Sequence, residues 1–222
     1  MKKIIALILL LLFDWNYTNA QSFELMSGVE RVFVDVQYLK HFDVNKKISL
    51  FTRTRATAEY SEHNTNLFTG AYLNYTNKFG FGGSVIGRVS STGAGIDAGV
   101  HYFKASKTFV IYALPSININ NELLYSWFSI IRYTPTINQD WKLYTSLELF
   151  SAFGEIGHLN SIERIRFGVN KKGYKFGLAI NLNQSRFSDT DINSGVFIRK
   201  QFLIKKHEIS IYRNWQCGLC TC

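Results

Sequence analysis

The amino-acid sequence predicts one all-β domain, an antiparallel transmembrane β-barrel of about 12 strands that follows a cleaved signal peptide. Three observations lead to this fold class. Segments all along the chain alternate between large apolar residues and polar or small ones, the period of two that marks a strand with unlike environments on its two faces. No run after the amino terminus approaches 18 apolar residues, so no spanning helix is predicted. Outward-facing aromatic residues gather beside the short turns.

The clearest segment is the hairpin within Ser161–Asn183. Its second half alternates strictly, with apolar residues from Tyr174 to Leu182 on one face and Lys, Gly, Ala and Asn on the other. Its first half sets Ile165 and Phe167 against arginines and glycine. The polar sequence Lys171-Lys172-Gly173 predicts a tight turn in which glycine takes a positive φ. A long apolar face opposite a charged, glycine-rich face fits lipid outside and polar groups inside.

The amino terminus reads as a secretory signal peptide over residues 1–20. Lys2 and Lys3 form the charged region, Ile4–Phe13 the apolar region, and Thr18-Asn19-Ala20 a small-residue cleavage site. The alternative is a membrane anchor, but ten apolar residues fall short of the roughly 20 that a spanning helix needs. An exported chain without a spanning helix but rich in alternating segments is expected in an outer membrane.

Composition supports one domain and does not indicate a nucleic-acid-binding protein. The chain has 222 residues, a formal charge of +9, 15% aromatic residues and only 2 prolines. A mean hydropathy near zero does not separate a soluble protein from a barrel, because alternating strands average their two faces. The positive charge does not indicate nucleic-acid binding, since the chain is exported and has no basic cluster.

Eleven alternating segments read as strands. They are residues 29–38, 48–60, 67–76, 79–90, 94–104, 108–117, 122–134, 141–153, 161–170, 174–183 and 192–202. Pro115, in the sixth, predicts a strand end or a locally unpaired position. Single-chain barrels usually have an even strand number. Residues 21–26 are therefore predicted to add a twelfth strand, and ten strands is the alternative. A strand at residues 206–213 would also make twelve but would end the chain on the wrong side.

Connection lengths provide a second argument for the barrel. The links at residues 77–78, 105–107, 136–140 and 171–173 are mostly short, and those at 61–66, 117–121, 154–160 and 185–191 are longer. This alternation predicts short periplasmic turns and longer external loops. A membrane-interface belt is then predicted from the aromatic residues beside the short turns, which are Tyr75, Phe79, Tyr102, Tyr133, Trp141, Tyr174 and Phe202.

Several segments resemble a known group of proteins: VFVDVQ (residues 32–37), LFTRTRAT (50–57), LFTGAYLNYT (67–76), WKLYTSLELF (141–150) and GVFIRKQF (195–202). These are similar to uncharacterised outer-membrane β-barrel proteins of Bacteroidetes-type Gram-negative bacteria, over about Met26 to Phe202. The resemblance implies the fold and the location, and it brings no catalytic residues. It also implies that Phe202 is the terminal aromatic residue recognised by the barrel-insertion machinery.

This chain departs from that pattern because residues 203–222 continue past Phe202. Cys217, Cys220 and Cys222 all lie there, whereas a disulfide-built fold would spread its cysteines through the body. Their C-x-x-C-x-C spacing has no histidine or carboxylate close by, so no metal site is predicted. The domain plan is a signal peptide at 1–20, a barrel at 21–202, and a C-terminal tail at 203–222 that is interpreted as disordered or non-native.

Many of the positions predicted to face the lumen are charged. The predicted lumen-lining set is Arg53, Arg55, Glu59, Arg88, Asp97, His101, Arg132, Glu148, Arg164 and Arg166, with Glu122, Lys142, Lys175 and Arg199 on the same parity. Buried charges are tolerated when they are paired or hydrated. Hairpin register predicts the pairs Arg88–Asp97 and Glu148–Arg166.

Three functions are compatible with this interior. The first is a structural or interaction role for a barrel filled by ion pairs. The second is a small anion-preferring pore lined by the surplus arginine. The third is an outer-membrane enzyme that hydrolyses lipids or peptides, but Asp97 and His101 lie roughly 13 Å apart along one strand, and His63 and His158 lie in predicted loops without a serine nucleophile motif. We therefore predict no catalytic, cofactor-binding or metal residues. The predicted partners are outer-membrane lipid, lipopolysaccharide and the insertion machinery.

Overall fold

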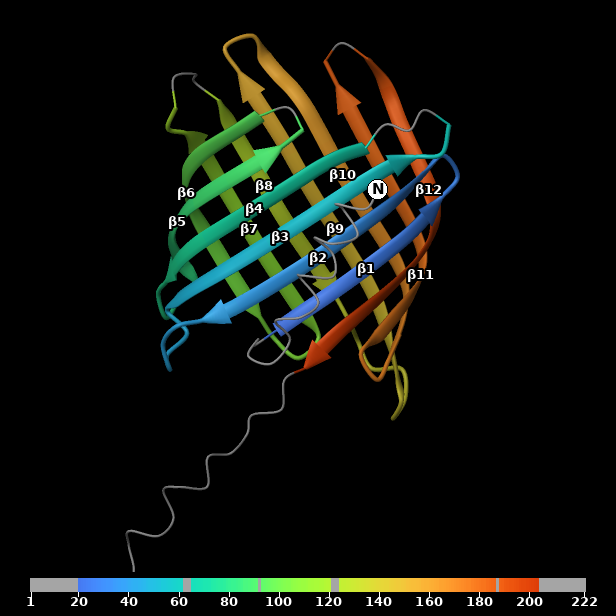
Figure 1. Cartoon of the computed structure of the whole chain (residues 1–222). Coiled ribbons are helices and arrows are strands. Elements are labelled where there is room, and N and C mark those ends of the chain that lie inside the picture. Colours follow the sequence, from blue (N-terminus) through green and yellow to red (C-terminus); the bar gives the residue numbers. More distant parts are fainter. Residues whose placement is uncertain (1–19, 62–64, 92, 121–123, 187, 204–222) are drawn as a thin grey trace, which may run out of the picture.

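The chain forms one closed barrel in which every strand is antiparallel to its neighbours (Figure 1). This computed structural model describes residues 20–61, 65–91, 93–120, 124–186 and 188–203. Its strands are β1 (Ala20–Gly28), β2 (Arg31–His41), β3 (Ile48–Glu59), β4 (Thr65–Thr76), β5 (Phe81–Ser90), β6 (Gly93–Ala105), β7 (Phe109–Asn118), β8 (Tyr125–Tyr133), β9 (Trp141–Gly154), β10 (Gly157–Lys171), β11 (Tyr174–Ser185) and β12 (Ser188–Leu203).

The barrel closes where the first strand meets the last. Residues of β1 pair with β12 from Ala20–Leu203 to Gly28–Gly195, and β1 pairs with β2 on its other side. The short twelfth strand predicted at the amino terminus is thus confirmed, and the ten-strand alternative is wrong. The other candidate strand, at residues 206–213, lies outside the described residues. So do residues 1–19, and the signal peptide stays a prediction.

Alternation along each strand separates the two faces of the wall. In β2, Phe33, Asp35 and Gln37 are buried whereas Val36 is exposed. In β11, Leu178 is 63% exposed while its neighbour Ala179 is buried. A β-strand places successive side chains on opposite faces, so the exposed apolar residues form the outer surface and the buried ones fill the lumen. The described part of the chain contains no helix long and apolar enough to cross a membrane.

The turn between β10 and β11 follows its sequence signature. Lys172 and Gly173 both have positive φ, 50° and 82°, as a two-residue hairpin loop requires when it matches the twist of the strands it joins. Lys171 pairs with Tyr174 directly beside the turn. The tight turn predicted here, with glycine in the left-handed region, is confirmed.

The predicted division into short turns and long loops is wrong at two of its four longer loops. Residues 154–160 were expected to form a loop, but β9 runs to Gly154 and β10 begins at Gly157. Residues 185–191 were also expected to form a loop, but β12 already begins at Ser188. The backbone hydrogen bonds between paired strands continue into these polar segments, because both strands of each hairpin remain extended there. Figure 1 shows both hairpins rising beyond the rest of the barrel.

Proline interrupts one ladder, as predicted. Gly99 of β6 pairs with Ser116 of β7, and the next recorded pair is Tyr102 with Ala113, so pairing is absent opposite Pro115. Proline has no N–H to donate to the ladder. On its other side Pro115 stays in register with Trp127 of β8.

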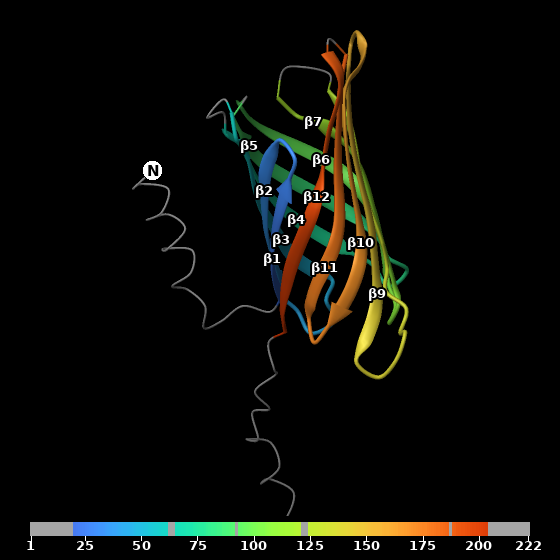
Figure 2. The same ribbon diagram turned by 90° about the vertical axis from the view of Figure 1, so that its right-hand side faces the viewer.

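Exposed aromatic residues lie at both ends of the barrel, and Tyr60, Tyr125 and Phe153 mark the end opposite the chain termini of the barrel. We call the end where β1 begins and β12 finishes the terminal end, and the opposite end the distal end. The seven aromatic residues of the predicted belt lie at strand ends or turns of the terminal end, and Tyr75, Phe79, Tyr133 and Tyr174 are exposed there. Lysines stack on three of these rings, Lys78 on Phe79, Lys171 on Trp141 and Lys200 on Tyr174. The barrel is narrower in Figure 2 than in Figure 1, so its cross-section is flattened.

Candidate functional site

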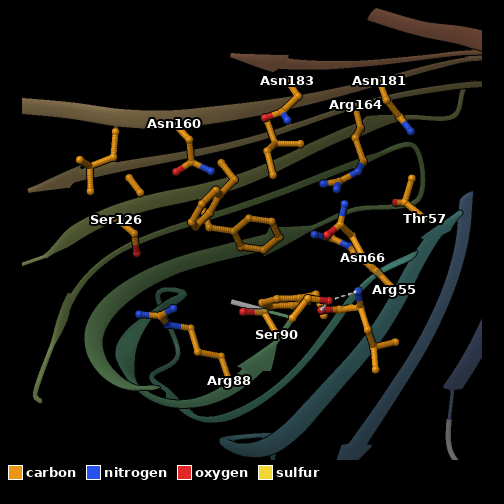
Figure 3. Close-up of a pocket in the computed structure, with 18 of the residues that line it drawn as sticks. Arg55, Thr57, Asn66, Arg88, Ser90, Ser126, Asn160, Arg164, Asn181 and Asn183 are labelled. Atoms are coloured by element: carbon orange, nitrogen blue, oxygen red, sulfur yellow. Dashed lines mark hydrogen bonds between the residues drawn. The ribbon is translucent and has the colours of Figure 1, made fainter. Parts of the chain in front are cut away.

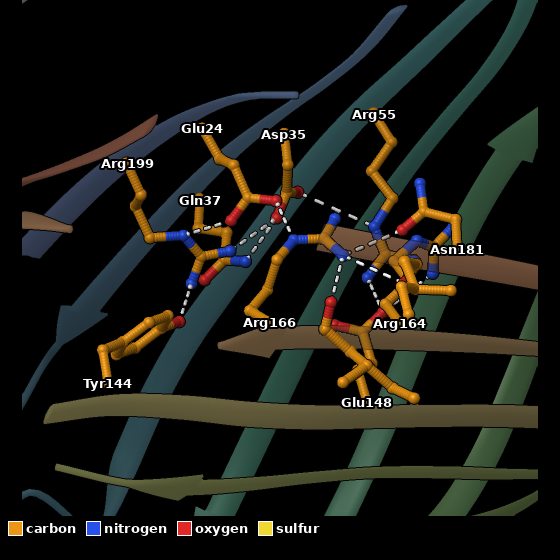
Figure 4. Close-up of polar contacts among 12 residues, drawn as sticks. Glu24, Asp35, Gln37, Arg55, Tyr144, Glu148, Arg164, Arg166, Asn181 and Arg199 are labelled. Atoms are coloured by element: carbon orange, nitrogen blue, oxygen red, sulfur yellow. Dashed lines mark hydrogen bonds and ion pairs between the residues drawn. The ribbon is translucent and has the colours of Figure 1, made fainter. Parts of the chain in front are cut away.

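Three carboxylates hold five arginines in one connected network at the middle of the lumen (Figure 4). Glu24 of β1 contacts Arg166 at 2.9 Å and Arg199 at 2.7 Å. Asp35 of β2 receives hydrogen bonds of 2.7 and 2.6 Å from Nε and Nη2 of Arg53, and one of 3.4 Å from Arg199 links it to Glu24. Glu148 of β9 accepts from Arg53 at 2.6 Å, from Arg55, and from Arg164 at 2.9 Å. We call these eight residues the lumen network.

The lumen network joins opposite walls of the barrel. Arg53 stands on β3 and Glu148 on β9, which lie halfway round the ring from each other. Their direct contact at 2.6 Å therefore crosses the flattened lumen. A second bond, 3.4 Å from Arg132 on β8 to Gln37 on β2, joins another opposite pair of strands. The side chains of Arg53, Asp35 and Glu148 are 0–6% exposed, so the network fills this part of the lumen.

Aromatic and aliphatic side chains fill the rest of the cross-section. Tyr72, Ile86, Leu114, Phe128 and Ile130 form one buried cluster from β4, β5, β7 and β8. Beneath it, towards the terminal end, Ser84 bonds both Asn74 and His101 at 2.7 Å. His101 also bonds Thr76 at 2.9 Å. His101 therefore belongs to a local polar cluster between β4, β5 and β6, with each ring nitrogen bonded to a hydroxyl.

Positive charge exceeds negative charge in this interior. The lumen network contains five arginines and three carboxylates. Arg132 and Lys175 add to the excess: among the described residues Arg132 bonds Gln37, and Lys175 bonds Gln201 at 3.0 Å and lies over the Tyr144 ring. Charges in a low-dielectric interior attract counter-charges over longer distances than charges in water do. The excess positive charge of the described lumen residues is therefore only weakly screened.

A cavity of about 540 Å³ lies between the lumen network and the distal rim (Figure 3). Arg55 and Arg164 form part of its base, and Arg31 and Arg88 stand higher on its walls. Ser90, Ser91 and Tyr125 place its upper part at the distal ends of β5 and β8. Rings of Phe33, Tyr72, Phe128 and Phe150 provide its apolar surface.

The predicted lumen-lining residues have different environments. Arg53, Asp97, His101, Glu148 and Arg166 are buried, as are Lys175 and Arg199. Arg55, Glu59, Arg132 and Arg164 are half-buried. The Arg88 side chain is 35% exposed within the distal cavity, and Lys142 is exposed at the terminal end. Glu122 lies outside the described residues.

One predicted ion pair forms and the other does not. Arg88 donates from Nε to Asp97 at 2.7 Å, although Asp97 is one diagonal step from the directly opposite position. Glu148 does not pair with Arg166. Strand register sets Glu148 opposite Arg164, and Arg166 instead reaches Glu24. Arg53 contacts Glu148 across the lumen, and Arg166 contacts Glu24 three strands away. Hairpin register alone could not identify these two pairs.

Sequence reasoning also missed a histidine–serine contact on the outer face near the distal end. His158 bonds Ser161 at 2.8 Å through Nε2, and Ser161 bonds Ser151 at 2.8 Å. A β-bulge in β10 between His158 and Asn160 puts residues three apart on the same face. His158 was predicted to lie in a loop, which is wrong, because β10 begins at Gly157. No group of three or more potential metal ligands occurs within the described ranges, and the tail cysteines lie beyond them.

Comparison with known proteins shows the fold. No protein-family model and no curated protein matches the chain. Among solved structures, the NanC porin is similar with a TM-score of 0.51 and 8% identity over 83% of this chain and 99% of that one. The KdgM porin in complex with disordered oligogalacturonate has a TM-score of 0.50 and 9% identity over 84% and 99%. The chain therefore has the fold of outer-membrane porins, with a buried, ion-paired interior.

Proposed function

We propose that this chain resides in the outer membrane as a barrel whose lumen is closed by the lumen network, and that it has an interaction role. The observation that carries the proposal is the contact between Arg53 and Glu148 from opposite walls. A porin keeps water along its whole axis, and large barrels leave an aqueous channel. Here buried charged and aromatic side chains occupy the middle of the lumen, and the 540 Å³ cavity above them remains for a ligand.

The location rests on the fold and on the outer surface. Exposed apolar residues on alternate positions suit acyl chains, and the aromatic residues at the terminal end suit one membrane interface. We propose that the terminal end, where β1 begins and β12 ends, faces the periplasm and that the distal cavity faces the outside. Lipopolysaccharide then surrounds the distal end, and Phe202 is the residue for the insertion machinery. Membership of a Bacteroidetes-type family remains part of this proposal.

Solute flux tests the closed lumen. Proteoliposomes loaded with chloride and containing refolded protein are expected to release it no faster than protein-free liposomes. Variant Lys142→Gln, at the exposed terminal end, serves as a matched control that should behave in the same way. Rapid chloride release from wild-type proteoliposomes would overturn the closed barrel. Correct refolding is checked separately by heat-modifiable migration in gels and by β-type circular dichroism.

A small anion-preferring pore is the second candidate, and the excess of arginine in the lumen favours it. Basic residues lining a constriction select anions. The oligogalacturonate in the KdgM structure is likewise an anionic solute in a barrel of this fold. The same liposomes distinguish the candidates: a pore would release chloride much faster than potassium, whereas a closed barrel would retain both.

We infer that the chain is not an enzyme. The contact between His158 and Ser161 is the arrangement nearest to a nucleophile and base. Among the described residues, however, the side chain of His158 hydrogen-bonds Ser161 and packs on the ring of Phe153, and no carboxylate bonds it. A catalytic serine site also needs a group that orients the base. Lipase and protease assays on refolded protein are expected to show no turnover. Hydrolysis that Ser161→Ala removes and Ser151→Ala retains would contradict this.

A further inference from the structure

We propose that the distal cavity binds a soluble sugar acid, a ring that carries hydroxyl groups and one carboxylate. This inference rests on the interaction role proposed above and names its ligand class. The cavity volume of about 540 Å³ lies within the range of small-molecule sites, roughly 300–1,000 Å³. Such sites combine apolar surface with a few converging polar groups. Three features of the lining indicate which ligand these groups suit.

The first feature is charge. Arg31, Arg55, Arg88 and Arg164 line the cavity, against the carboxylates of Asp97 and Asp191. The lining residues therefore carry more positive than negative charge, although Arg55 and Arg164 share Glu148 and Arg31 also pairs with Glu30. These carboxylates limit how much negative charge a ligand can bring. Arg88 is the arginine best placed to receive it, because its side chain is 35% exposed and its Nε already bonds Asp97. A guanidinium matches the geometry of a carboxylate. A ligand with a single carboxylate suits this small excess of positive charge better than a multiply charged phosphate does.

The second feature is a set of uncommitted amides. Asn66, Asn160 and Asn183 line the cavity and make no side-chain hydrogen bond to any described residue. Two other lining amides are already engaged: Asn193 bonds the backbone at Glu30 and Arg31, and Asn181 bonds Arg166.

The free amides stand on opposite walls, since β4 carries Asn66 and β10, halfway round the ring, carries Asn160 (Figure 3). Each primary amide offers donors and an acceptor, as a hydroxyl group does. Ring hydroxyls pointing to both sides would therefore find partners on both walls of the cavity.

The third feature is the apolar surface. Phe33, Phe128 and Phe150 line the cavity, and the Phe128 ring lies 6.4 Å from that of Tyr72. These rings suit the C–H face of a sugar ring, as apolar pocket walls suit the apolar part of a ligand. The barrel wall separates the cavity from the surrounding lipid, so a lipid-anchored sugar would not enter from the side. The ligand therefore arrives from solution at the distal end.

Calorimetric titration of the refolded full-length chain in detergent tests this assignment. The probes are D-glucuronate, D-glucose and acetate. Glucuronate is expected to bind at least about ten-fold more tightly than either of the others, because only it satisfies both the arginine and the amides. Glucose or acetate binding as tightly as glucuronate would overturn the proposal, as would absence of binding by all three.

Variants locate the binding. Arg88→Gln is expected to weaken glucuronate binding about ten-fold, and Asn160→Ala to weaken it by a smaller factor. Lys104→Gln removes the same charge from an exposed position at the terminal end and should leave the affinity unchanged. Equal effects of Arg88→Gln and Lys104→Gln would overturn the site.

Chloride release from liposomes distinguishes failure of the proposed ligand from failure of the proposed closed lumen. Liposomes that retain chloride, together with no glucuronate binding, overturn the ligand alone. Liposomes that release chloride, together with tight binding, overturn the closed lumen alone.

Discussion

At the scale of single residues, Glu148 is, with Asp35, one of the two carboxylates of the described lumen that contact three arginines each. It accepts hydrogen bonds from three arginines, on β3 and on β10, and its side chain is 6% exposed. Removing one member of a buried ion pair leaves its partners charged and without compensation, which costs more than the pair itself contributes. The stability of this barrel should therefore depend on Glu148 more than on any exposed carboxylate.

Variant Glu148→Gln is expected to lose about 3–5 kcal/mol of unfolding free energy, because Arg53, Arg55 and Arg164 lose their shared carboxylate. Urea unfolding of the refolded barrel in detergent measures this loss. The control is Glu155→Gln, an exposed residue between β9 and β10, which should change stability by less than about 0.5 kcal/mol. Equal stability of the two variants would contradict the role of the network.

Replacing Arg132 should not destabilise the barrel, unlike replacing Glu148. The described hydrogen bond of Arg132 is a long one, 3.4 Å to Gln37, and Arg132 forms no ion pair with any carboxylate in the described part of the chain. Variant Arg132→Met retains the length of the side chain and removes a positive charge from a region that already has an excess. We expect its unfolding free energy to equal or exceed that of the wild type, whereas Arg53→Met should be strongly destabilised. A larger loss for Arg132→Met than for Arg53→Met would disprove this charge balance.

At the scale of elements, alternation allowed most of the wall to be predicted from sequence. Inward and outward faces follow from the period of two, and the glycine turn at Lys172-Gly173 follows from its residue types. The strand ends were predicted less well, because polar residues near Gly157 and Ser188 continue to pair. The His158–Ser161 contact was missed because it depends on a bulge that moves a residue out of the simple alternation.

The β10–β11 turn gives a test at this scale. Gly173 has a φ of 82°, and a Cβ there would lie 3.1 Å from the Gln201 carbonyl oxygen. Variant Gly173→Ala should lose roughly 1 kcal/mol of unfolding free energy. Gly83→Ala is the matched control, since a Cβ there would meet nothing within 4 Å. A loss for Gly83→Ala as large as that for Gly173→Ala would show that the turn conformation is not the cause.

At the scale of the whole molecule, the contacts that cross the lumen could not be predicted. Hairpin register identifies partners on adjacent strands, as with Arg88 and Asp97. The pairing of Arg53 with Glu148 depends on which strands lie opposite each other and on how far the barrel is flattened. Neither property is encoded locally. The same is true of the distal cavity, whose amides come from β4, β10 and β11.

The orientation of the barrel gives a prediction at this scale. In a background with Cys217, Cys220 and Cys222 replaced by serine, Glu155→Cys at the distal end should react with a membrane-impermeant maleimide on intact cells. Lys172→Cys, in the terminal-end turn, should react only after the cells are broken. Labelling of Lys172→Cys but not Glu155→Cys on intact cells would reverse the orientation and place the distal cavity in the periplasm.

The central claim is that ion pairs between opposite walls close the lumen, and electrical recording tests it most directly. Refolded wild-type protein inserted in a planar bilayer is expected to give no conductance steps above the lipid background. Its insertion is checked by protease protection in the same lipid. Reproducible anion-selective steps from the wild-type barrel would contradict the account, because they require a continuous water path where Arg53 and Glu148 meet.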